Sequence, residues 1–180
     1  MRSLSTPVAA VLLGIMLAAP AHAAPGTWDH AANIKDAAQR LAKLHKREGS
    51  TGVLKFLDAC YRTHMLASDF SKGLESCMAQ DYMHTQVLAT IYSKLPPERL
   101  QRLGAPSPQR IADAMSTRFV AAFTQYKVSV ADGEDFKKLV DTHGFPVFIK
   151  AVFPKGTPAE ADAGKPDAGK TGGAKSGSEK

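Results

Sequence analysis

The stretch CYRTHMLASDFSKGLESC, residues 60–77, contains both cysteines of the chain and the turn on which the expected fold depends. Apolar residues at helical spacing lie on each side of a turn centred near Ser68, and a short connection makes two helices antiparallel neighbours. Cys60 lies eight residues before Ser68 and Cys77 lies nine after it, so both stand at the same height in the hairpin. Cysteines that are level and face each other reach bonding distance. We expect a structural disulfide between Cys60 and Cys77.

Two other uses of these cysteines fit the sequence less well. A redox centre of the thioredoxin type needs a Cys-x-x-Cys pair at a helix start, which this chain lacks. A metal site is suggested by Cys60 and His64, which share a helical face. The hairpin places His64 opposite Gly73 and His84 opposite Val53, so the two histidines are roughly 16 Å or more apart along the axis. We therefore predict no metal site and no cofactor.

The remainder of the chain is helical by the same periodicity. Helices are expected over residues 29–47, 51–66, 70–94, 108–127 and 130–143, with a short helix at 96–104. Residues 145–153 could form a strand or a last helical segment, and a helix is favoured because the chain offers no partner strand. The predicted class is all-α, a compact bundle of about four main helices plus short ones.

The helix at 51–66 is expected to be the central one. Its apolar residues cover a wide face: Val53, Leu54, Phe56, Leu57, Cys60 and Tyr61. A face of this width is typical of a helix that is surrounded by others.

Three polar residues interrupt apolar stripes and form the candidate site. Asp81 and His84 lie on a stripe of the 70–94 helix, and Arg118 lies on a stripe of the 108–127 helix. Buried charges need partners, so Asp81 and Arg118 are expected to form a structural ion pair. The alternative is a polar site in which Asp81 and His84 act as acid and base. A second stripe through Met78, Tyr82 and Thr85 would instead turn both polar residues towards solvent.

The two ends of the chain predict export and a spacer. Residues 1–23 combine Arg2, an apolar run of about 12 residues and an Ala-His-Ala cleavage pattern, as in a secretory signal peptide. The run would rise about 18 Å as a helix, too little to span a bilayer core. From residue 154 to 180 the chain has no aromatic, Leu, Ile, Val or Met, which predicts a disordered low-complexity tail. Residues 24–153 are left as one helical domain in a periplasmic or secreted protein without a transmembrane span.

Composition and motifs narrow the function without naming it. The formal net charge is +6, and the lysines and arginines are scattered, so no nucleic-acid partner is expected. The chain has no known catalytic signature. The first hypothesis is a non-catalytic binding or accessory protein whose partner is another envelope protein or an anionic cell-surface component. The alternative is a small-molecule-binding or hydrolytic domain around Asp81 and His84.

Overall fold

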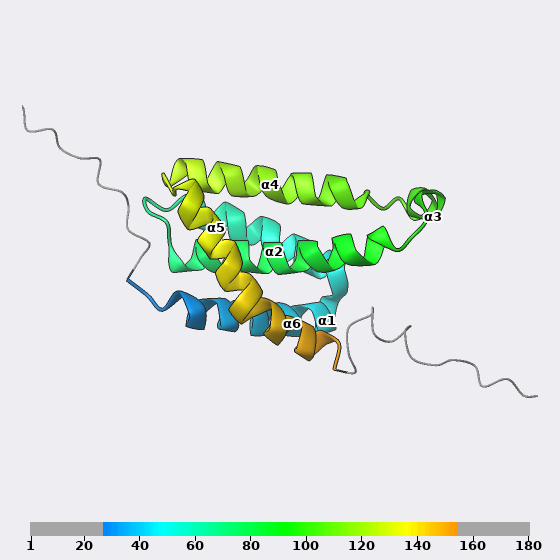
Figure 1. Ribbon diagram of the computed structural model, residues 1–180, viewed down its shortest axis with the longest axis horizontal. Helices are drawn as coiled ribbons and strands as arrows, with labels where there is room; N and C mark the ends of the chain where they lie inside the picture. The colour runs from blue at the N-terminus through cyan, green and yellow to red at the C-terminus, as the bar shows by residue number, and fades with distance from the viewer. Residues whose placement is uncertain (1–26, 155–180) are drawn as a thin grey trace, which may run out of the picture.

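The computed structural model describes residues 27–154, which are almost wholly helical and contain no β-strand (Figure 1). The elements are α1 (His30–His64), α2 (Lys72–Ser93), α3 (Pro97–Arg102), α4 (Pro108–Gln125), α5 (Val130–Leu139), the π-helix η1 (Val140–Gly144) and α6 (Phe145–Val152). The predicted all-α class is confirmed. The signal peptide expected at 1–23 and the tail expected from 154, except for Pro154 itself, lie outside the described residues.

α1 consists of two arms that meet at Gly49. Gly49 has φ 64° and ψ −170°, a conformation that glycine adopts at little cost and other residues avoid. Figure 1 shows that the arm before Gly49 and the arm after it run in opposite directions. The bundle therefore has four long helical segments, as the sequence predicted: the two arms of α1, together with α2 and α4.

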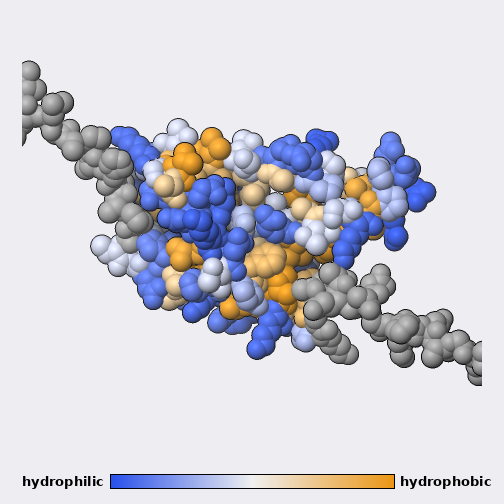
Figure 2. All heavy atoms as spheres, in the orientation of Figure 1, coloured by the Kyte–Doolittle hydropathy of each residue, from blue (hydrophilic) through white to orange (hydrophobic). Residues whose placement is uncertain are grey.

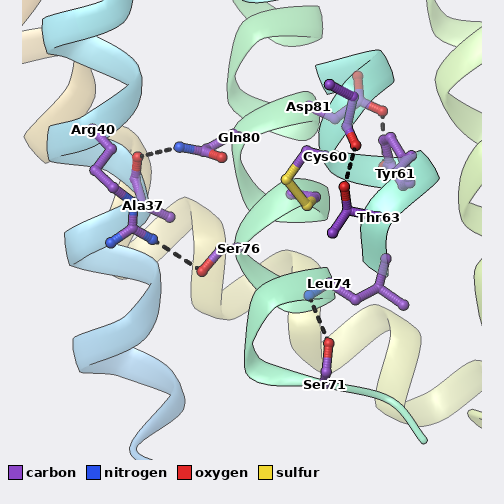
Figure 3. The surroundings of a disulfide bond; sticks show 12 residues. Ala37, Arg40, Cys60, Tyr61, Thr63, Ser71, Leu74, Ser76, Gln80 and Asp81 are labelled. Carbon is purple, nitrogen blue, oxygen red and sulfur yellow. Dashed lines mark hydrogen bonds between the residues drawn. A yellow bond between two sulfur atoms is a disulfide. The ribbon is translucent and has the colours of Figure 1, made fainter. Parts of the chain in front are cut away.

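α2 is the central helix, and the expectation that the 51–66 helix would be central is wrong. Every residue from Leu74 to Thr85 is buried, because α2 packs against both arms of α1, against α4 and against η1. In the second arm of α1, by contrast, Leu54 is 52 % exposed and Phe56 is 38 % exposed. Figure 3 shows α2 between the two arms of α1.

Serine side chains fix where three helices begin. The hydroxyls of Ser71, Ser107 and Ser129 accept hydrogen bonds from backbone N–H groups at the starts of α2, α4 and α5. Such caps satisfy donors that have no partner within the helix. The helix start expected at residue 108 is confirmed: Ser107 is the cap and Pro108, whose ring suits the first helical position, is the first residue of α4.

The last helical segment continues through Gly144, where the sequence predicted an end. The N–H of Phe145 donates to the carbonyl of Val140, five residues back, so η1 shifts the hydrogen-bond register before α6. The shift comes next to Pro146, which has no N–H to donate. The expectation of a helix rather than a strand after Gly144 is confirmed.

The core lies around α2 and is closed by η1 and α6. Gly144 packs closely against Ile34 of α1 and Met83 of α2, which brings the backbone of η1 near both helices. Phe148 of α6 is fully buried in the same core. None of the helices within residues 27–154 has the length and apolar character needed to cross a membrane.

Candidate functional site

Asp81 is the centre of a buried polar network that links three helical segments. Its carboxylate is 1 % exposed. Arg118 of α4 donates to it twice, from Nε to Oδ2 and from Nη2 to Oδ1, both at 2.7 Å. The hydroxyl of Tyr61, on the second arm of α1, donates to Oδ2 at 3.0 Å, and that of Thr85 donates to Oδ1 at 3.3 Å. Both carboxylate oxygens therefore have two donors each.

The electrostatics of this network oppose the loss of a proton from Tyr61 and from Arg118. Burial, with the negative charge of Asp81 beside it, raises the pKa of Tyr61 far above its ordinary value. Burial alone would lower the pKa of Arg118, but the hydrogen bonds and charge of Asp81 raise it above its usual range. The guanidinium also lies 5.9 Å from the centre of the Tyr61 ring, in cation–π range. None of these properties suits a group that exchanges protons at neutral pH.

His84 is buried beside this network but is not hydrogen-bonded to it. Its ring is 1 % exposed, and Nε2 has no hydrogen-bond partner among residues 27–154. The nearest ring is that of His45, with centroids 6.3 Å apart. Burial, and next the neighbouring His45, lower the pKa of His84 to about 4. His84 is thus neutral at pH 7. The alternative expectation, in which the helix turns Asp81 and His84 towards solvent, is wrong because both residues are 1 % exposed.

A cavity of about 230 Å³ lies away from Asp81, between the start of α2 and the α4–α5 corner. Ten residues line it: His30, Phe70, Glu75, Phe123, Tyr126, Val128, Asp132, Asp135, Phe136 and Leu139. Its walls are mostly apolar, and two of its aromatic rings, those of Phe123 and Phe136, pack edge to face with each other and with Phe119. We call this space the aromatic cavity. In Figure 2 apolar spheres gather near the same α4–α5 corner.

Glu75 is the buried acid at one end of the aromatic cavity. It is 2 % exposed, and Trp28 Nε1 and Asn33 Nδ2 both donate to Oε2 at 2.7 Å. His30 Nδ1 contacts Oε1. A carboxylate has about four acceptor positions, so these three contacts leave room for one further donor. Glu75 was not predicted as a site residue, although a Glu directly after the apolar Leu74 in the expected 70–94 helix was a possible signal.

A second cavity, of about 250 Å³, lies between α2 and the two arms of α1. It is lined by Leu44, Phe56 and Gln80 and by three cations of the first arm: Arg40, Lys43 and Arg47. Figure 3 shows Arg40 reaching from this arm to Ser76, with its Nη2 donating to Ser76 Oγ at 3.1 Å. We call this space the basic cleft. Asp81, His84 and Arg118 line neither cavity.

Cys60 and Cys77 form a disulfide with Cα atoms 5.9 Å apart, which joins the second arm of α1 to α2 (Figure 3). His64 lies beside it, and its ring occupies the place where a side chain at Gly73 would stand. His64 is therefore opposite Gly73, as the hairpin predicted. The sulfur atoms and one ring nitrogen of His64 lie within 4.8 Å of one another, a group that the predicted separation of His64 from His84 did not take into account.

Comparison of the chain with protein-family models, curated proteins and solved structures returned no match.

Proposed function

We propose that this chain is an exported, non-catalytic helical binding protein, periplasmic or secreted. The observation that carries the proposal is the state of Asp81. Its two oxygens accept four hydrogen bonds, and the residue lines neither the aromatic cavity nor the basic cleft. An acid–base residue needs a substrate within reach. The buried, satisfied Asp81–Arg118 pair favours a structural role, and the cavities elsewhere favour binding.

The aromatic cavity is the binding site that we assign to this function. Apolar walls with a small number of fixed polar groups are typical of ligand pockets. Among residues 27–154, the acids that line the space are Glu75, Asp132 and Asp135, and the single basic residue on its wall is His30. This charge pattern, with the free acceptor position on Glu75, favours an apolar group that carries an amine. The group can belong to a small molecule or to a side chain of an envelope protein.

Trp28 makes this assignment testable, because it is the single tryptophan and it donates directly to Glu75. Phenethylamine, added to the purified chain, is expected to change Trp28 fluorescence saturably. Phenylacetate has the same ring and the opposite charge, and it should bind at least 10-fold more weakly. Val128→Phe fills the cavity and should weaken phenethylamine at least 10-fold. Val120→Phe makes the same change on an exposed face of α4 and should leave binding unchanged.

Two results would contradict the cavity assignment. One is an absence of saturable phenethylamine binding to the wild-type chain. The other is equal weakening by Val128→Phe and Val120→Phe, which would mean that the probe binds elsewhere.

The basic cleft favours an anionic cell-surface component as a second partner. Lys43 and Arg47 of the first arm line the same cleft as two apolar side chains, Leu44 of the first arm and Phe56 of the second. Such a surface attracts an acidic headgroup together with apolar chains. Lys43→Gln with Arg47→Gln should reduce sedimentation with vesicles that contain an anionic lipid. The control pair Arg99→Gln with Arg102→Gln removes the same charge from α3 and should have little effect.

Export itself is tested on the protein recovered from a cell envelope fraction. The intact mass should correspond to loss of residues 1 to about 23, the interval that ends at the expected cleavage pattern. Without reductant, no thiol should be open to alkylation. An intact N-terminus on the envelope protein would overturn the export proposal.

A further inference from the structure

We propose that Cys60, Cys77 and His64 bind a thiolate-seeking metal ion, of the Zn²⁺ or Cu⁺ class, when the disulfide is reduced. The two states exclude each other, because the sulfur atoms that bind the ion are the ones that form the disulfide. The three ligand atoms already lie within 4.8 Å of one another. Around one zinc ion, tetrahedral sulfur and nitrogen ligands stand roughly 3.5–4 Å apart, so small side-chain movements suffice.

The geometry of the hairpin explains why His64 reaches the cysteines. Cys60 is level with Cys77, and His64, one turn further along α1, is level with Gly73. Side chains on a helix lean towards its N-terminus. His64 thus leans back towards the level of Cys60, and Cys77 leans towards the level of Gly73. The imidazole and the sulfur of Cys77 approach each other between these two levels, and the disulfide holds the sulfur of Cys60 beside them.

Gly73 is the second observation that supports the site. A Cβ atom built on Gly73 would collide with the imidazole of His64, so only glycine leaves the ring its place against α2. Glycine is a poor helix former, and Gly73 is the second residue of α2. The residue that weakens α2 here is the one that seats the histidine one turn before Cys77.

The three ligands differ in burial, so the proposed site is accessible from one side. Cys77 is fully buried, whereas Cys60 and His64 are half-buried. An ion can approach past Cys60 and His64, and a fourth position stays open to water or to another ligand. Zinc sites with three protein ligands and an open position are typical of exchangeable or reactive metal.

The redox step needs a reductant, for which a dithiol is sufficient. The Sγ–Sγ bond takes up two electrons and two protons and becomes two thiols, while the dithiol loses them and closes to its own disulfide. Metal binding then displaces the two thiol protons to solvent. The ion stays on the protein until it is removed and the thiols are oxidised again.

The experiment compares oxidised and reduced chains in competition with a chromophoric zinc chelator. The chain is reduced without oxygen by a phosphine, which is converted to its oxide with water as the proton source. We expect one Zn²⁺ per reduced chain, bound at least 100-fold more tightly than by the oxidised chain. His64→Ala should weaken zinc binding to the reduced chain at least 10-fold, and Gly73→Ala should weaken it as well. The matched control, His143→Ala in η1, should leave zinc binding unchanged.

Helix content is measured by circular dichroism in the same samples, because reduction could loosen the fold. If the reduced chain loses helix, Zn²⁺ is expected to restore it in the wild type and not in His64→Ala. Equal zinc affinity of the oxidised and reduced chains would overturn the proposal. Equal affinity of reduced wild type and reduced His64→Ala would also overturn it. The aromatic cavity plays no part in this test, so its outcome is independent of the proposed function.

Discussion

Trp28, which precedes α1, donates a hydrogen bond of 2.7 Å from Nε1 to Oε2 of Glu75, which is buried in α2. The same oxygen accepts from Asn33, which is itself 2 % exposed. The first turn of α1 is thereby fixed to the central helix through one carboxylate. The same carboxylate lines the aromatic cavity, so the wall of the proposed binding site and the start of the bundle depend on one residue.

Glu75→Ala should destabilise the protein by about 2–3 kcal/mol, because one N–H of the buried Asn33 amide loses its acceptor while the other keeps the carbonyl of Lys72. Trp28 is only half-buried, so its indole N–H can turn to water, and its emission should shift to longer wavelength. Urea unfolding and fluorescence measure the two effects. Glu134→Ala removes an exposed acid that pairs with Lys137 and should cost less than about 0.5 kcal/mol. A Glu75→Ala chain with unchanged stability and emission would contradict this account of Glu75.

Removal of the disulfide should lower the free energy of unfolding by about 3 kcal/mol. The bond closes a loop with a sequence separation of 17, and cross-linking a loop of this size restricts the unfolded chain by about that amount. The measurement compares urea unfolding of the oxidised wild type with that of Cys60→Ala/Cys77→Ala. A loss below about 1 kcal/mol would show that the unfolded chain is already compact around this hairpin.

His84 should make the protein sensitive to mild acid. Its pKa is about 4 in the folded chain, where burial disfavours the charged ring, against about 6.5 when the chain is unfolded. Between these values the unfolded state binds more protons, so stability is complete above pH 6.5 and falls as the pH drops towards 4. The full loss corresponds to about 3 kcal/mol.

Unfolding titrations at several pH values check the role of His84. His84→Leu should flatten the decline between pH 6.5 and 4, and His143→Leu should leave it in place. The same decline in wild type and His84→Leu would assign the acid sensitivity to other groups.

The features of the fold that depend on local spacing could be predicted from the sequence. The turn near Ser68 and the equal distances to Cys60 and Cys77 were sufficient for the hairpin, its register and the position of His64 opposite Gly73. The Ser107–Pro108 pair was sufficient for the start of α4. In each of these cases the interacting residues are close in sequence or are related by one antiparallel hairpin.

The features that the sequence did not predict depend on packing between distant segments. The sequence of α2 contains two possible apolar stripes, one through Asp81 and one through Tyr82. Periodicity alone suggested that one of them would be buried and the other exposed. The structure buries both, because helices surround α2 on several sides. The contacts of Glu75 with Trp28 and Asn33 join residues more than 40 positions apart. No local pattern marks such a pairing, and the aromatic cavity depends on it.

The most direct test of the central claim, that Asp81 is structural, is a double-mutant cycle of Asp81→Ala and Arg118→Ala by urea unfolding. The Arg118 side chain is 38 % exposed and that of Asp81 is 1 % exposed. Arg118→Ala therefore strands a buried carboxylate and should cost about 3–5 kcal/mol, whereas Asp81→Ala leaves a guanidinium that can reach water and should cost less. The double mutant should cost less than the sum of the two single changes, because no lone charge remains. Additive effects with free energies of unfolding close to that of the wild type would contradict the claim and favour a functional site at Asp81.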